Sequence, residues 1–147
     1  MREFLSENES FKNTDVAALY LRLSKEDIDK MNRGDDSESI KNQRILLTDE
    51  ALKRGFIIAD VYSDDDYSGT DSERPAFKRL IEDAKLKKFN VILCKSQSRF
   101  TRDMETAEKY INRIFPLLGI RFISIVDNID TNIKGNKKAR QINALIN

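Results

Sequence analysis

Two kinds of apolar segment alternate along this chain of 147 residues, and the alternation constrains its fold more than any other feature. Short, continuous apolar runs are typical of strands buried on both faces of a parallel sheet. They predict strands at Val16–Leu23, Phe56–Ser63, Val91–Cys94 and Ile120–Val126. Apolar residues at helical spacing predict helices over Glu38–Arg54, Pro75–Ala84, Met104–Leu118 and Asn136–Asn147. The order β-α-β-α-β-α-β-α with short connections predicts an α/β domain with a largely parallel sheet.

Two segments lie outside this pattern, and the last helix of the pattern lacks an end signal. Residues 1–14 are polar with scattered apolar side chains, and they predict a flexible leader. The charged segment Ser24–Ser37 carries Gly34 and has no sustained period, so it predicts a mobile loop. The last predicted helix reaches Asn147 without a stop signal, from which we expect the chain to continue in a longer parent protein.

The composition excludes several classes of active site. The chain has no histidine, which rules out Ser-His-Asp triads, imidazole bases and His-ligated zinc. Its single cysteine, Cys94, rules out internal disulfides and fits a core position in a reducing cytosol. The 26 Lys and Arg balance 25 Asp and Glu, so a polybasic tail is not the main means of binding nucleic acid. No apolar run approaches the roughly 20 residues of a membrane span, and we expect a soluble intracellular protein.

Polar residues follow three of the predicted strands at their carboxyl ends, where ligands bind in parallel α/β sheets. Arg22 and Ser24 close the first strand, and the two-residue period of a strand places both on one face. The turn-rich segment Asp64–Glu73 follows the second strand, and Lys95–Arg102 follows the third. The topology thus predicts one cleft that gathers a serine and four arginines. These are Ser24, Arg22, Arg74, Arg99 and Arg102.

This composition suits chemistry at a phosphodiester. Guanidinium groups match phosphate oxygens in bidentate fashion, and a fixed cluster of them stabilises the charge that develops during attack on phosphorus. Arg99 and Arg102 precede a predicted helix start, where cations are disfavoured unless an anion is present. A serine hydroxyl attacks only when its proton is taken or shared. In a chain without histidine, a carboxylate, water or the guanidinium groups must assist, and the sequence leaves these alternatives open.

Other readings of the same residues stay open. Gln43 lies on the apolar stripe of its helix, where its amide could satisfy a backbone group or reach into the cleft. The Asp64–Asp66 triplet could be a solvated turn or could hold Mg²⁺, which would make the protein a metal-dependent phosphotransferase or nuclease. A third hypothesis is a non-catalytic α/β self-association module whose arginines bind an anion without chemistry.

The chain resembles the N-terminal catalytic domain of the serine recombinases, the resolvase/invertase superfamily, and especially the large serine recombinases of mobile elements. The resemblance covers about Val16 to Asn147 and depends on a combination of motifs. The motifs are Tyr20-Leu21-Arg22-Leu23-Ser24, Gln43 on the next helix, Asp64 with Tyr67-Ser68-Gly69, Arg74-Pro75 and Ser98-Arg99-Phe100-Thr101-Arg102. The fold it implies is a three-layer, resolvase-like α/β domain with a central, mostly parallel sheet of four to five strands flanked by helices.

The resemblance implies a site-specific DNA recombinase. Ser24 would cleave the DNA phosphodiester to give a covalent 5′-phosphoserine intermediate, followed by strand exchange and religation. The four arginines would hold the phosphate and stabilise the transition state, with Gln43 and Ser68 in support. No metal or cofactor is expected. The implied partners are double-stranded DNA at attachment sites and further copies of the chain, as a dimer and a tetramer on DNA, in the bacterial cytoplasm and with no membrane.

The resemblance also implies an order of parts along the chain. The catalytic domain would span residues 15–134, after the leader over 1–14. Residues 135–147 would start an interface helix that is cut short here, and the DNA-binding domains would lie outside this chain. We therefore expect this stretch alone to fold but to recombine DNA poorly or not at all.

Overall fold

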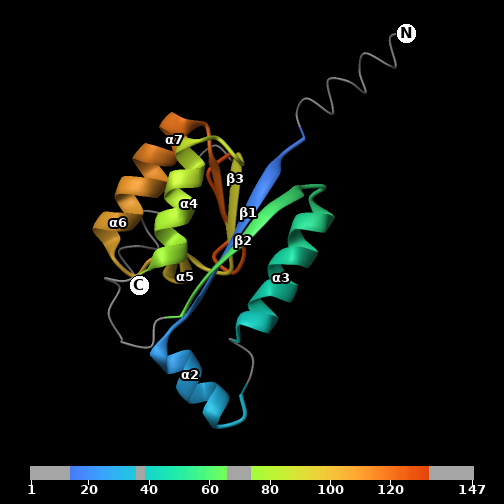
Figure 1. Cartoon of the computed structure of the whole chain (residues 1–147), viewed down its shortest axis with the longest axis vertical. Coiled ribbons are helices and arrows are strands. Elements are labelled where there is room, and N and C mark those ends of the chain that lie inside the picture. The colour runs from blue at the N-terminus through green and yellow to red at the C-terminus, as the bar shows by residue number, and fades with distance from the viewer. Residues whose placement is uncertain (1–13, 36–38, 66–73, 133–147) are drawn as a thin grey trace.

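Five strands form one sheet at the centre of the domain, in the spatial order β2-β1-β3-β4-β5 (Figure 1). The computed structural model describes residues 14–35, 39–65 and 74–132. The parallel strands are β1 (Val16–Leu23), β2 (Ile57–Asp65), β3 (Val91–Cys94) and β4 (Arg121–Ser124), and β5 (Ile129–Asp130) pairs with β4 in the antiparallel sense. The predicted fold class, a mostly parallel sheet flanked by helices, is confirmed.

Helices cover both faces of this sheet and make three layers (Figure 1). On one face, α3 (Ile40–Lys53) buries Leu47 and Ala51 against alternate side chains of β1 and β3. On the other face, α4 (Pro75–Lys85) buries Phe77 and Leu80 in a second apolar cluster with the remaining side chains of the same strands. Because both faces are covered, the central strands are apolar on both sides, which explains their continuous apolar sequence.

The helix predicted over Met104–Leu118 forms as three joined segments. These are α6 (Met104–Lys109), a π-helical turn (Tyr110–Ile114) and α7 (Phe115–Leu118). The wide turn ends two residues before Pro116, whose ring would clash with the carbonyl four residues earlier in a regular α-helix. Gly119, in the left-handed region with φ 72°, ends α7.

The four predicted strands are confirmed, two of them with shifted ends. β3 matches its prediction residue for residue, β2 starts one residue later than predicted and continues to Asp65, and β4 is confined to the middle of Ile120–Val126. The two-residue β5 was not predicted from apolar pattern, because two residues carry no period. Of the leader predicted over 1–14, residues 1–13 lie outside the described residues, as does the whole helix predicted over 136–147.

The mobile loop predicted over Ser24–Ser37 is wrong for most of its length. This segment begins with the helix α2 (Lys25–Asn32), which projects from the carboxyl end of β1 (Figure 1). Ser24 caps the helix, and Asp27 completes a capping box by accepting the Ser24 N–H. The sequence Ser24-Lys25-Glu26-Asp27 has the spacing of a capping box, which predicts a helix start without any apolar stripe. In the part of the chain that the structure describes, no helix is long and apolar enough to cross a membrane.

Candidate active site

Ser24 lies where β1 ends and α2 begins, and its residue is 3% exposed. The Ser24 Oγ donates a hydrogen bond to Asp27 Oδ2 at 2.8 Å. The Ser24 N–H donates to the same oxygen, also at 2.8 Å, while the Asp27 N–H donates to Oγ at 3.3 Å. The hydroxyl proton of the candidate nucleophile therefore points at a carboxylate.

Asp27 connects Ser24 to one of the predicted arginines. The Asp27 side chain is 2% exposed, and its second oxygen, Oδ1, accepts a hydrogen bond from Arg99 Nη2 at 2.8 Å. Arg99 belongs to the short helix α5 (Gln97–Phe100), which follows β3. Ser24, Asp27 and Arg99 thus form one continuous chain of hydrogen bonds, here called the Ser24–Asp27–Arg99 chain.

Among the residues that the structure describes, Arg22 is the largest fully buried side chain, with 1% exposure. Its Nε donates to the backbone carbonyl of Arg99 at 3.2 Å, and its Nη2 donates to the carbonyl of Ser98. The guanidinium therefore fixes the turn that carries Arg99. A buried arginine needs such acceptors, because an unpaired buried charge is costly.

Gln43 of α3 holds the backbone of Arg22. The Arg22 N–H donates to Gln43 Oε1 at 3.3 Å, and Gln43 Nε2 donates to the Arg22 carbonyl at 3.0 Å. The sequence left two roles open for the Gln43 amide, and these bonds match the first, in which the amide pairs with backbone N–H and C=O groups. The contact locks β1 two residues before Ser24.

Arg74 approaches from the N-terminus of α4 and is buried. Its guanidinium carbon lies 4.1 Å from the centre of the Phe77 ring, a cation–π distance. Its Nη2 donates to the Tyr20 hydroxyl at 2.8 Å and to the carbonyl of Phe100, which lies next to Arg99. Arg74 therefore contacts the loop that bears Arg99, without a direct bond to Ser24.

Asp64 is engaged in structural hydrogen bonds. Its carboxylate accepts the Tyr20 hydroxyl at 2.7 Å and the N–H groups of Ala76 and Phe77 at 2.9 Å each. It thereby caps α4, whose N-cap residue Arg74 makes no side-chain cap bond of its own. Burial raises the pKa of Tyr20 well above its ordinary value, so the phenol keeps the proton that it donates to Asp64.

The magnesium site suggested for Asp64–Asp66 gains no support from this geometry. Three donors already hold the Asp64 oxygens, and Asp66 lies outside the described residues. Within residues 14–35, 39–65 and 74–132, no group of three or more acidic or cysteine side chains is arranged to hold a metal ion.

Arg102 lies at the outer edge of the site. Its side chain is 47% exposed, and its Nη2 contacts Glu26 Oε2 on α2 at 3.2 Å. Asp103 follows it as the N-cap of α6. The first turn of α2 thus offers a carboxylate to each of two neighbouring arginines.

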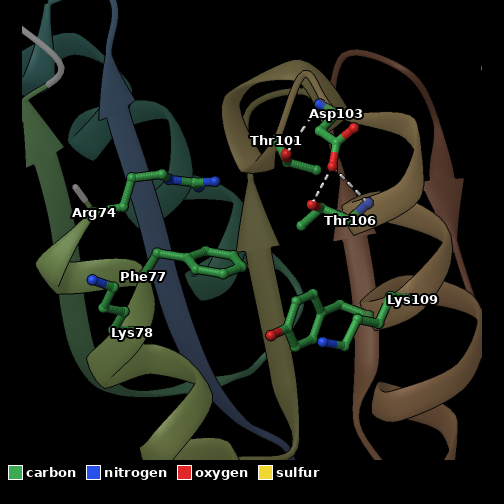
Figure 2. A pocket seen from close by; sticks show the side chains of 8 residues that line it. Arg74, Phe77, Lys78, Thr101, Asp103, Thr106 and Lys109 are labelled. Atoms are coloured by element: carbon green, nitrogen blue, oxygen red, sulfur yellow. Dashed lines mark hydrogen bonds between the residues drawn. The ribbon is translucent and has the colours of Figure 1, made fainter. Parts of the chain in front are cut away.

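A pocket of about 560 Å³ opens beside Arg74, between α4 and the start of α6 (Figure 2). Arg74, Phe77 and Lys78 line it from the α4 side, and Thr101, Asp103, Thr106, Lys109 and Tyr110 line the other side. Three cations against one carboxylate give this pocket a positive charge, as expected next to a site for an anion.

The model of the "Resolvase, N terminal domain" family matches residues 17–147. The chain belongs to the resolvase N-terminal domain family. The N-terminal catalytic domain of TP901-1 integrase is similar in sequence and structure, with 29% identity, a TM-score of 0.71 and coverage of 88% of this chain and 95% of that chain. This chain is therefore the catalytic domain of a site-specific recombinase.

Two further solved structures share the fold. A resolvase family site-specific recombinase from Streptococcus pneumoniae is 21% identical, with a TM-score of 0.68 over 90% of this chain and 87% of that one. The C-terminal catalytic domain of ISC1926 TnpA, an IS607-like serine recombinase, is 20% identical, with a TM-score of 0.60 over 87% of this chain and 78% of that one. No curated protein sequence matches the chain.

The resolvase-family domain gathers six of the seven predicted site residues. Hydrogen bonds link Ser24, through Asp27, to Arg99, and link Arg99 to Arg22, whose backbone Gln43 holds. Arg74 contacts the same loop through Phe100, and Arg102 joins α2 through Glu26. Ser68 lies outside the described residues.

Sequence reasoning missed Asp27. The predicted loop over Ser24–Ser37 includes Asp27, although the sequence carries the Ser-x-x-Asp spacing of a capping box. No local signal indicates its second contact, because Arg99 is 72 residues away in the chain.

Proposed function

We propose that Ser24 is the nucleophile of this recombinase domain. Its Oγ attacks a phosphodiester of double-stranded DNA, which gives a 5′-phosphoserine link and a free 3′-OH, and religation follows strand exchange. The observation that carries this proposal is the Ser24–Asp27–Arg99 chain, which joins a serine hydroxyl to a carboxylate and a guanidinium without histidine. A hydroxyl with an adjacent base, oriented by a third group, is the common arrangement of an activated nucleophile.

The arginines divide into two groups by burial and partner. We assign Arg99 and Arg102 to direct contact with the phosphate, because each contacts a carboxylate on the first turn of α2, beside Ser24. A guanidinium has five N–H donors, so it can bind a phosphate while it keeps this carboxylate contact. We assign Arg22 and Arg74 to the support of the loop between β3 and α6, since both donate to its backbone carbonyls, and Arg74 also lines the adjoining cationic pocket. Gln43 supports Arg22, and a supporting role for Ser68 stays a prediction.

The wider assignments follow from the family. We propose that the substrate is attachment-site DNA, that the protein works as a dimer and a tetramer of the chain on that DNA, and that it acts in the bacterial cytoplasm. We further propose that residues 15–134 form the catalytic unit and that residues 135–147 begin an interface helix.

The test is a covalent trap. The protein is incubated with attachment-site DNA that carries a nick next to the cleaved bond, so that the released strand diffuses away and religation fails. We expect a denaturation-resistant protein–DNA adduct with the wild type and none with Ser24→Ala, in the presence or absence of a chelator. An adduct that survives in Ser24→Ala would contradict the proposal. Cleavage without an adduct that a chelator abolishes and Ser24→Ala does not would favour the metal-dependent alternative.

A further inference from the structure

We propose that Asp27 is the general base for Ser24. This inference rests on the proposed function of Ser24 as nucleophile, and it supplies the proton acceptor that a chain without histidine needs. The Ser24 Oγ donates to Asp27 Oδ2 at 2.8 Å, within the range at which a general base takes a proton. Asp27 touches the reacting atom itself, before any DNA is present.

The carboxylate is held in one orientation. The Ser24 N–H donates to the same oxygen that receives the hydroxyl proton, and Arg99 Nη2 holds the other oxygen at 2.8 Å. The Asp27 side chain is buried, so no bulk water competes for its position. A base fixed by a third group is preorganised and needs no search for the productive geometry.

The charged groups around Asp27 come from three elements. Arg99 faces it from α5, and Arg22 of β1 donates to the carbonyls of the turn that carries Arg99. Glu26, its neighbour on α2, contacts Arg102 and not Ser24. Arg99 therefore balances the negative charge of the Asp27 carboxylate, and Glu26 places no second carboxylate on Ser24.

The chemical step balances as follows. The Oγ–P bond forms while the Oγ–H bond breaks, and the proton moves to Asp27 Oδ2. The P–O3′ bond breaks with its electron pair on O3′, which takes a proton from water and leaves as the 3′-OH. In religation O3′ attacks phosphorus and releases its proton to water, and Asp27 returns its proton to Oγ.

The same contact has a competing explanation with the opposite consequence. A carboxylate that contacts both Ser24 and Arg99 occupies two partners of the phosphate and could block the site until DNA displaces it. Loss of the Asp27 charge then accelerates cleavage, whereas loss of a general base slows it. The sign of the effect therefore separates the two explanations.

The experiment measures single-turnover formation of the covalent adduct on nicked attachment-site DNA. Asp27→Asn keeps the size of the side chain and an oxygen acceptor for the Ser24 N–H but is a poor base. Asp27→Glu keeps a carboxylate and the usual capping-box residue. Asp29→Asn is the matched control, because it removes one negative charge from the exposed side of the same helix.

We expect Asp27→Asn to slow adduct formation by about 10²- to 10⁴-fold, the usual contribution of general base catalysis. Its rate should then rise about tenfold per pH unit, because hydroxide must replace the lost base. Asp27→Glu should recover part of the rate with a flatter pH profile, and Asp29→Asn should match the wild type. Thermal unfolding of each variant shows that α2 and the domain stay folded.

Three results would overturn the inference, each in a different way. If the wild type forms the adduct and Asp27→Asn forms it equally fast or faster, Asp27 is no base, although Ser24 remains the nucleophile. If the wild type forms no adduct at Ser24, the proposed function itself fails and the inference fails with it. An equal loss of rate at every pH in Asp27→Asn would assign Asp27 a purely structural role.

Discussion

Asp64→Ala tests whether the Asp64 carboxylate stabilises the domain by capping α4 and by accepting the Tyr20 hydroxyl. The substitution removes an acceptor of three hydrogen bonds, from the Tyr20 hydroxyl and from the N–H groups of Ala76 and Phe77. Loss of a helix cap costs about 0.5–2 kcal/mol. A buried hydroxyl left without its acceptor costs about 1–3 kcal/mol. The free energy of unfolding should therefore fall by about 2–4 kcal/mol.

Thermal and urea unfolding measure this loss. For a domain of this length, 1 kcal/mol corresponds to about 2–4 °C, so Tm should drop by roughly 5–15 °C. Tyr20→Phe removes the hydroxyl that Asp64 accepts. In the Tyr20→Phe background, Asp64→Ala should therefore lose only the helix-cap contribution to the free energy of unfolding. The double-mutant cycle should show a coupling of about 1–3 kcal/mol between the two positions. The exposed neighbour Asp65→Ala is the matched control and should change stability by less than about 0.5 kcal/mol.

The reasoning is refuted if Asp64→Ala and Asp65→Ala have the same unfolding free energy. The effect of Mg²⁺ on Tm separates the structural role of Asp64 from the metal-site hypothesis. Because protein donors hold the Asp64 oxygens, Mg²⁺ should leave the Tm of the wild type unchanged. A rise in Tm with Mg²⁺ that Asp64→Ala abolishes would instead support the metal-site hypothesis.

Two further predictions concern the rest of the domain. Burial raises the pKa of Asp130, but hydrogen bonds from Arg121 and the Asn132 N–H, with the charges of Arg121 and Arg54, outweigh it and leave this pKa below its ordinary value. The Asp130 carboxylate therefore stabilises the fold at pH values above its unfolded pKa of about 4. This stabilisation is lost as the pH falls through the lower pKa that Asp130 has in the folded state. Asp130→Asn should therefore flatten the acid side of a plot of Tm against pH. Burial also raises the pKa of the Cys94 thiol, so a thiol reagent should label this single cysteine only as the domain unfolds, and rapid labelling of the native protein would contradict its place in the core.

The sheet and the large helices could be predicted because their signals are local. β3 is a run of four apolar residues buried on both sides, and α4 begins at Pro75 with a regular apolar stripe. α2 could not be found in this way. Only Asp27 of that helix is buried, so no apolar stripe marks it, and its stability comes from caps at its first turn.

The candidate site was predicted from topology better than from residue chemistry. The carboxyl ends of parallel strands bring Ser24 and Arg99 to one edge, as the strand order predicts. The sequence could not indicate that Arg22 donates to backbone carbonyls, because those acceptors belong to a turn 76 residues away. The role of Gln43 as a clamp on the Arg22 backbone likewise depends on how α3 packs against β1.

Peptide mapping of the trapped adduct tests the central claim most directly. After nuclease digestion and proteolysis, mass spectrometry locates the amino acid that carries the nucleotide, and end labelling identifies the released DNA end. The account predicts a phosphodiester on Ser24 with the 5′ end of the DNA and a free 3′-OH on the other strand end. A nucleotide on any other residue, or a 3′-phosphate link to the protein, would contradict it.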